Sequence, residues 1–201
     1  MKNSRTKLFQ ELSAEAAECT RCPAMCGRSA VLSELNGSPE ARIMFIGEAP
    51  GRKGADRTRV PFSGDQSGTN FDRFLSSIEL TRKEIFITSA ALCNPRAESG
   101  ANRKPTQKEL ANCSIFLQRT IDLVDPRVIV TLGSVALESL KRIQSHDLSL
   151  KSSAAQIHSW NNRVLVPIYH PSPQVLASHR REAEQLKDYQ VVAKAIHRLQ
   201  R

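Results

Sequence analysis

Apolar residues along the chain follow two patterns, one typical of buried strands and one typical of helices. Short apolar runs at 42–46, 84–88, 128–132 and 164–169 are bounded by polar or glycine-rich segments, and each predicts a strand. Elsewhere apolar residues recur every three or four positions, as in amphipathic helices. These helices are expected at 6–17, 69–78, 107–124, 134–143 and 175–199.

Helical segments separate the predicted strands. Thr106 and Glu109 form a capping box that begins the helix of 107–124, whereas 145–153 is polar and predicts a surface loop. Strands that alternate with helices are typical of βαβ units with right-handed crossovers. The sequence therefore predicts a single α/β domain over residues 1–201 with a parallel sheet.

Polar residues stand at the ends of three predicted strands. Glu48 follows the first strand, Ser89 the second and His170 the fourth. In open parallel sheets, ligands bind beyond the carboxyl ends of the strands. Pro171 favours an extended backbone at His170 and ends the strand there. A lone histidine is usually structural, but one held at this edge is a candidate for function.

A glycine-rich loop, 47–51, follows the first strand. Its Gly-x-x-x-Gly spacing is one way to cradle a phosphate, but it matches neither a Walker loop nor a dinucleotide fingerprint. Glu48 in this loop either caps nearby backbone amides or takes part in chemistry, and the sequence leaves both readings open. Asp56 and Asp65 are interpreted as turn-forming residues.

Composition and charge argue against a membrane or secreted protein and favour a protein that binds a polyanion. The chain has 201 residues, 40% of them apolar, and no apolar run reaches the roughly 18 residues of a membrane helix. Its first residues lack the apolar core of a secretory signal, so we expect a cytoplasmic protein without a membrane partner. A net charge of +9 favours a polyanionic partner. Aromatic residues make up only 5%, so any base stacking depends on one or two rings.

The five cysteines indicate a metal or redox site rather than a disulfide framework, given the expected compartment. Cys19 and Cys22 form one pair, and Cys93 and Cys113 a second, distant pair. Four thiolates in this arrangement suit either tetrahedral zinc or a [4Fe–4S] cluster, and spacing does not separate the two. Buried cysteines acting as small hydrophobes are the alternative. Cys26 is surplus, either a bystander or a substitute ligand.

Four motifs in order resemble those of the uracil-DNA glycosylase superfamily, most closely its iron–sulfur families four and five. They are Gly47-Glu48-Ala49-Pro50-Gly51, Pro61-Phe62-Ser63-Gly64, the strand-ending Thr88 and His170-Pro171-Ser172. The resemblance spans nearly the whole chain from Cys19. It implies a three-layer α/β/α sandwich around a four-stranded parallel sheet. It also implies a [4Fe–4S] cluster on the ligands Cys19, Cys22, Cys93 and Cys113.

The resemblance implies a monofunctional DNA repair enzyme that hydrolyses the N-glycosidic bond of uracil and leaves an abasic site. The uracil would be flipped out of single- or double-stranded DNA. Glu48 would position water or stabilise the sugar cation, Phe62 would stack on the base, and His170 would hydrogen-bond the uracil carbonyl. The remaining base-site residues would be Gly47, Ala49, Pro50, Gly51 and Ser89. We expect a nucleoid-associated monomer.

Two departures from the family pattern leave alternatives open. Family four usually has asparagine, which reads the uracil edge, where this chain has Ser89, so another deaminated base such as hypoxanthine is an alternative substrate. The loop around Asp56 resembles family five, in which an acid in this loop is proposed to act, so Asp56 rivals Glu48. Segment 94–105 lacks the histidine of the branch that traps uracil covalently. A non-catalytic, metal-stapled DNA-binding module is a further alternative.

The segment that begins at Ser172 is expected to face the minor groove. Val175 or Leu176 would wedge into the base stack that the flipped nucleotide leaves. Several basic residues are candidates for phosphate contacts, with a solvated surface charge as the alternative for each. They are Arg96, Arg103, Lys104, Arg180 and Arg181.

Overall fold

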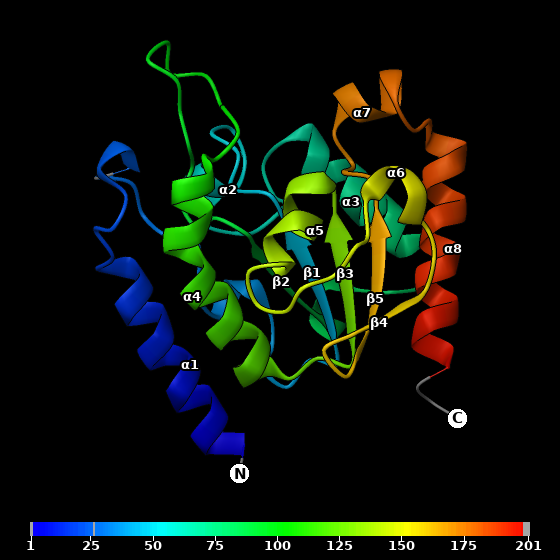
Figure 1. Cartoon of the computed structure of the whole chain (residues 1–201), viewed down its shortest axis with the longest axis horizontal. Helices are drawn as coiled ribbons and strands as arrows, with labels where there is room; N and C mark the ends of the chain where they lie inside the picture. Colours follow the sequence, from blue (N-terminus) through cyan, green and yellow to red (C-terminus); the bar gives the residue numbers. More distant parts are fainter. Residues whose placement is uncertain (1, 26, 199–201) are drawn as a thin grey trace.

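A mixed sheet forms the centre of the protein, whose computed structural model describes residues 2–25 and 27–198 (Figure 1). Within these residues the sheet has five strands in the order β2-β1-β3-β5-β4. The strands are β1 (Ile43–Gly47), β2 (Ile85–Ser89), β3 (Val128–Leu132), β4 (His158–Trp160) and β5 (Arg163–Ile168). All neighbouring pairs are parallel except β4 with β5. The four predicted strands and their parallel pairing are therefore confirmed.

The strand count of four was wrong by one, because β4 adds an antiparallel edge strand. Its three residues are too few to show an alternating pattern. Asn161 and Asn162, both with positive φ (48° and 57°), join it to β5. Two left-handed residues in a two-residue connection are the hallmark of a tight hairpin turn, and asparagine tolerates them well.

Helices cover both faces of the sheet. They are α1 (Lys2–Ala17), α2 (Ala55–Thr58), α3 (Gln66–Ser76), α4 (Gln107–Val124), α5 (Ser134–Leu140), α6 (Leu150–Ser153), α7 (Pro173–Ser178) and α8 (Glu182–His197). Short 3-10 helices lie at Pro23–Met25, Glu34–Asn36 and Arg82–Glu84. The helices predicted before β1 and before β3 are confirmed. Two details differ, because α6 lies inside the predicted loop and the C-terminal helix is divided into α7 and α8.

Successive strand residues bury opposite faces, which produces three layers. Met44, Ile46 and Phe86 pack with α1, α4 and α5 in one apolar cluster. Phe45 and Ile87 pack with α3 and α8 in the other. In Figure 1, α1 and α4 stand together on one side and α8 on the far side. The predicted three-layer α/β/α sandwich is confirmed.

The aligned carboxyl ends of the strands define the edge where the site lies. Gly47 at the end of β1 is paired with Ser89 at the end of β2, and the N–H of Gly133, just after β3, donates to the Ile168 carbonyl at the end of β5 (2.8 Å). The arrows of β1, β3 and β5 point toward the top of Figure 1, where α7 and the loop before α4 rise above the sheet. Within residues 2–25 and 27–198, no helix is both long and apolar enough to cross a membrane.

Candidate functional site

The structure places Glu48, Ser89 and His170 at one edge of the sheet, as the sequence predicts. Glu48 and Ser89 are neighbours because the ends of β1 and β2 are in register. His170 approaches from β5, and a Cβ added to Gly133 would lie 3.5 Å from the His170 Cβ. All three side chains are half-buried. None of them makes a hydrogen bond or an ion pair with another described residue, so their polar atoms are available to a ligand.

Burial changes the protonation of two of these groups. It raises the pKa of Glu48 above the usual 4.5, and the positive charge of Lys104 partly opposes this change. It lowers the pKa of His170 to about 4, with the negative charge of Asp65 opposing. His170 is therefore neutral at pH 7 and carries one ring N–H that can donate a hydrogen bond.

The ring of Phe62 closes the site beside these residues. Its centroid lies 4.9 Å from that of Phe71 and 5.4 Å from that of His170. It passes so close to β1 that a Cβ on Gly47 would lie 2.9 Å from the Phe62 Cε2. A larger residue at position 47 would therefore displace the ring, which explains the glycine at the end of β1.

The other carboxylates of this region have partners. Asp56 forms an ion pair with Arg96, and its side chain is only 10% exposed. Asp65 caps α3 by accepting a hydrogen bond from the Gly68 N–H (3.0 Å). The sequence predicts Asp65 to form a turn, whereas in the structure it is the N-cap of α3. Asp56 ties the α2 turn to the loop after β2, which is a role that the sequence does not reveal.

The predicted base-site residues 49–51 are held by backbone contacts. The Pro50 carbonyl accepts a hydrogen bond from the buried Asn94 side chain (2.6 Å), and the Gly51 carbonyl accepts from the Gly54 and Asp56 N–H groups (3.0 and 3.1 Å). Ala49 packs against a small apolar cluster at Ala90, Ala91 and Leu110. These contacts fix the course of the loop that carries Glu48.

The segment after His170 forms α7, whose N-cap is Ser172 with its hydroxyl accepting from the Val175 N–H (3.4 Å). Val175 and Leu176 are half-buried, and Leu176 packs on the α3–α8 cluster. Arg180 binds the buried carboxylate of Asp188 through two hydrogen bonds (3.0 and 2.6 Å). Arg181 is exposed at the beginning of α8.

Arginines on the opposite loop are also paired. Arg103 binds Glu109 through two hydrogen bonds (2.7 and 2.6 Å), and this pairing lowers the pKa of Glu109 to about 2. Arg96 holds Asp56. Three of the predicted phosphate ligands, Arg96, Arg103 and Arg180, are thus braces between segments, and DNA contact by the basic residues stays a prediction.

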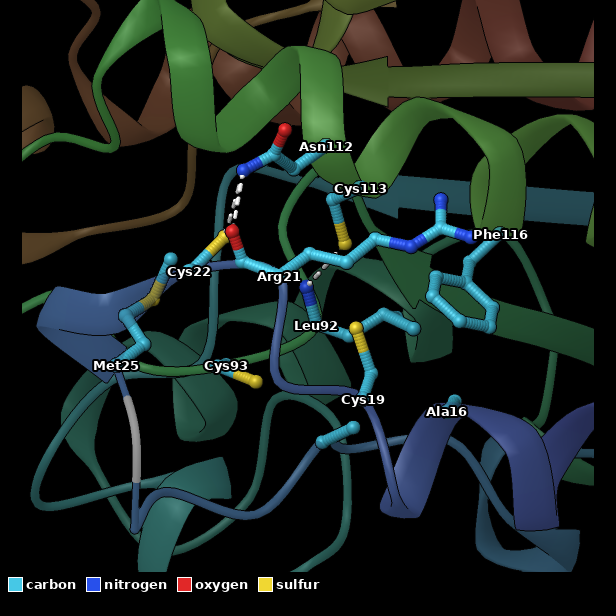
Figure 2. Close-up of a pocket in the computed structure, with 11 residues that line it drawn as sticks. Ala16, Cys19, Arg21, Cys22, Met25, Leu92, Cys93, Asn112, Cys113 and Phe116 are labelled. Carbon is cyan, nitrogen blue, oxygen red and sulfur yellow. Dashed lines mark hydrogen bonds between the residues drawn. The ribbon is translucent and has the colours of Figure 1, made fainter.

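Four cysteines line one small pocket (Figure 2). Cys19 follows α1, Cys22 comes shortly after it, Cys93 follows β2, and Cys113 lies in α4. The Leu92 N–H donates to the Cys113 sulfur (3.3 Å). The Asn112 amide donates to the Cys22 sulfur (3.5 Å). The predicted quartet is brought together, whereas Cys26 lies outside the described residues.

The chemistry of this pocket fits a metal group with thiolate ligands. Burial raises the pKa of Cys93 to about 11 and that of Cys113 to about 12, and the neighbouring cysteines add to both effects. Bound metal supplies the positive charge that such thiolates require. Among the described residues, no group of three or more His, Cys, Asp or Glu side chains is arranged so that it could hold a metal ion. The metal therefore stays a prediction.

Comparison with known proteins agrees with this site. A family model described as the uracil DNA glycosylase superfamily matches residues 36–200. The chain belongs to this superfamily. It is 31% identical to a type-4 uracil-DNA glycosylase of Thermotoga maritima over 84% of each chain. It is 34% identical to a type-4 enzyme of Saccharolobus solfataricus over 79% of this chain and 73% of the relative. A type-5 enzyme of Pyrobaculum aerophilum is 27% identical over 85% of each chain.

The predicted resemblance to families four and five is therefore confirmed.

Two residues that support the site through backbone carbonyls were not predicted from the sequence. Asn70 donates to the Pro171 carbonyl (2.8 Å), and Gln185 donates to the His170 carbonyl (3.2 Å). Both are buried polar residues on apolar helix faces. That mismatch is a signal that could have identified them, since buried polar groups require partners.

Proposed function

We propose that the protein is a DNA repair glycosylase that hydrolyses the N-glycosidic bond of uracil flipped out of DNA. The main support for this proposal is the carboxylate of Glu48, which is half-buried at a strand end and has no partner among the described residues. It lies at the same edge of the sheet as Ser89, Phe62 and His170. A structural carboxylate in this position would have a donor, as Asp56 and Asp65 do. The curated relatives, named as uracil-DNA glycosylases, support the same substrate.

Bond cleavage places positive charge on the sugar and negative charge on the departing base. Ionised Glu48 stabilises the sugar cation and orients the attacking water. Neutral His170 donates its ring N–H to the base carbonyl that gains negative charge. Both groups lie in a partly enclosed site, where preorganised charges and dipoles stabilise the transition state more than they would in water.

The base must leave the duplex before it reaches this edge. Flipping costs a few kcal/mol, least for mismatched or single-stranded bases. Stacking on Phe62 would offset about 1–3 kcal/mol of this cost. Helix α7 stands above the sheet edge in Figure 1 and carries Val175 and Leu176, one of which would insert into the vacated stack. We propose action on uracil in single- and double-stranded DNA by a cytoplasmic, nucleoid-associated monomer.

A second candidate substrate is hypoxanthine in DNA. The observation in its favour is Ser89, whose hydroxyl would lie 3.6 Å from a Cβ on Gly47 at the base site. Serine is smaller than asparagine and lacks the amide that reads one edge of uracil. The smaller serine side chain would therefore leave more room at this position for a larger deaminated base.

We propose that Cys19, Cys22, Cys93 and Cys113 hold a [4Fe–4S] cluster, with zinc as the alternative. The shared pocket and the N–H donors to two of the sulfurs support this ligand set. A bound cluster would cross-link the end of α1, the loop after β2 and the first half of α4. Such clusters can supply electron transfer, but hydrolysis requires none, so we assign this one a structural role.

Single-turnover excision from labelled uracil oligonucleotides, single-stranded and paired opposite guanine, tests the proposed reaction. Alkali-dependent strand cleavage identifies a monofunctional glycosylase. Glu48→Gln should lower the rate by about 100-fold or more while DNA binding persists. Glu11→Gln, on the exposed face of α1, is the matched control. Inactive wild type that still binds DNA would contradict the uracil assignment, and inosine oligonucleotides would then separate the second substrate from a non-catalytic module.

A further inference from the structure

We infer that Arg82 is a positioning residue that holds the Phe62 ring in the base site. Arg82 begins the short 3-10 helix before β2, distant in sequence from the loop that carries Phe62. It belongs to none of the motifs that identify the family. The inference rests on the proposed function, because it assigns Phe62 the stacking role.

All three guanidinium nitrogens of Arg82 donate hydrogen bonds, two to the Phe62 segment and one to α3. Its Nη1 donates to the Pro61 carbonyl (2.7 Å), and its Nη2 donates to the Phe62 carbonyl. Its Nε donates to Asp72 in α3 (2.6 Å), which fixes the plane of the guanidinium. The planar fork thus joins two successive carbonyls to a helix.

The same guanidinium supports the ring from behind. Its Cζ lies 5.5 Å from the centroid of Phe71, within the range of a cation–π contact. Phe71 in turn lies 4.9 Å from Phe62. Arg82 therefore reaches Phe62 by two routes, directly through its carbonyl and indirectly through the ring behind it.

The Phe62 backbone needs such support. Its φ of +50° is an unfavourable conformation for a residue with a side chain. Its carbonyl also lies against α3, because a Cβ on Gly68 would stand only 2.3 Å from the Phe62 oxygen. Without the donors of Arg82, two carbonyls would lose their partners and the segment could relax away from this conformation.

Arg82 acts through Phe62 and not on the base. Among the described residues, its hydrogen bonds and ring contact go to Pro61, Phe62, Phe71 and Asp72. None of them goes to Gly47 or His170, which lie beside the Phe62 ring. Arg73 provides a matched control, because it packs over Phe74 (5.4 Å) and pairs with Glu182 (2.9 Å) without touching the Phe62 segment.

A double-mutant cycle tests this coupling in single-turnover excision at saturating uracil DNA. Arg82→Gln should slow excision by roughly tenfold, the scale of one lost stacking contact. The same change should have less than about a threefold effect in a Phe62→Ala background, because the ring is already absent. Arg82→Lys should restore part of the rate, and Arg73→Gln should match wild type. Equal losses from Arg82→Gln in both backgrounds would overturn the inference.

A measurement without turnover separates failure of the clamp from failure of the proposed function. In NMR spectra of the folded variants, Arg82→Gln should shift the Gly47 amide and the His170 ring signals, which lie beside Phe62, while Arg73→Gln leaves them in place. If the wild type excises no uracil, the proposed function fails, and shifted signals still support the clamp. Unchanged Gly47 and His170 signals in Arg82→Gln overturn it whatever the activity.

Discussion

The rings of Phe62 and His170 lie 5.4 Å apart, centroid to centroid, with their planes inclined by 38°. Phe62 comes from the loop after β1, and His170 comes from the end of β5. The contact joins the stacking group of the proposed mechanism to its hydrogen-bond donor. The Phe62 ring also helps to bury the imidazole, and burial is what lowers the pKa of His170.

Stability should fall with decreasing pH because of His170. Its pKa drops from 6.5 to about 4 on folding, so between these values the unfolded chain binds a proton that the folded chain does not. By linkage, this costs up to about 3 kcal/mol of the unfolding free energy as the pH falls through this window. Urea titrations above pH 6.5 and just above pH 4 should show a smaller loss in His170→Asn. An equal loss in both proteins would contradict the assignment.

The excision rate should have an acid limb set by Glu48. Its carboxylate must be ionised, and burial places its pKa above 4.5, so activity is lost as the pH falls through that raised value. Lys104 opposes the rise, and Lys104→Gln should therefore move the acid limb of kcat to higher pH. Lys108→Gln, exposed in the first turn of α4, is the control. An acid limb unmoved by Lys104→Gln would remove Lys104 from the site.

Asp56 and Arg96 should behave as one brace. Asp56→Asn and Arg96→Gln each break the same ion pair, so we expect similar losses of about tenfold or less, and no further loss in the double variant. Single-turnover rates beside those of Glu48→Gln provide the measurement. If Asp56→Asn abolishes excision and Arg96→Gln does not, Asp56 is the catalytic acid.

The cysteine pocket should hold about four iron atoms per chain. Elemental analysis of anaerobically purified protein measures this directly, and a single zinc would favour the alternative. Cys113→Ser should lose the metal and unfold at lower temperature, because α1 and α4 are then no longer cross-linked. Cys26→Ser should keep the full metal content, and loss of metal from that variant would make Cys26 a ligand.

Arg180 and Arg181 should separate stability from DNA binding. Arg180→Gln leaves the buried Asp188 carboxylate without its partner and should cost about 2 kcal/mol or more of the unfolding free energy. Arg181→Gln should leave stability unchanged and reduce the slope of log K against log salt by about 1, as one phosphate contact does. The opposite pattern would show that Arg180 faces the DNA.

The sequence predicted the layers and the strand-end residues because both depend on local patterns. Apolar runs identify buried strands, and the rule for parallel sheets places Glu48, Ser89 and His170 at one edge. β4 escaped detection because three residues carry no period. The division between α7 and α8 also escaped detection, and Arg180, which lies at this break, binds Asp188 in α8.

Support for the site was harder to predict because it depends on contacts between distant residues. Arg82 lies in Thr81-Arg82-Lys83-Glu84, which resembles an ordinary exposed turn. Its role depends on carbonyls some twenty residues away, and nothing in the local pattern indicates that they meet. Arg96, Arg103 and Arg180, which were predicted to contact phosphate, show the converse, because local charge does not reveal the carboxylate with which each of these three pairs.

The packing of α1 on α4 has a consequence for the order of events during synthesis. Phe9, Leu12 and Ala16 are buried partly against Phe116, Leu117 and Ile121, and Cys19 meets Cys113 in the same region. About 90 residues separate Cys22 from Cys113, so a ribosome needs on the order of ten seconds to add the second half of this pocket. During that interval α1 lacks α4, one of the surfaces that it covers, although Phe86, which the Phe9 ring contacts, has already been made. The N-terminal segment, although made first, therefore completes its packing only after α4 has been added.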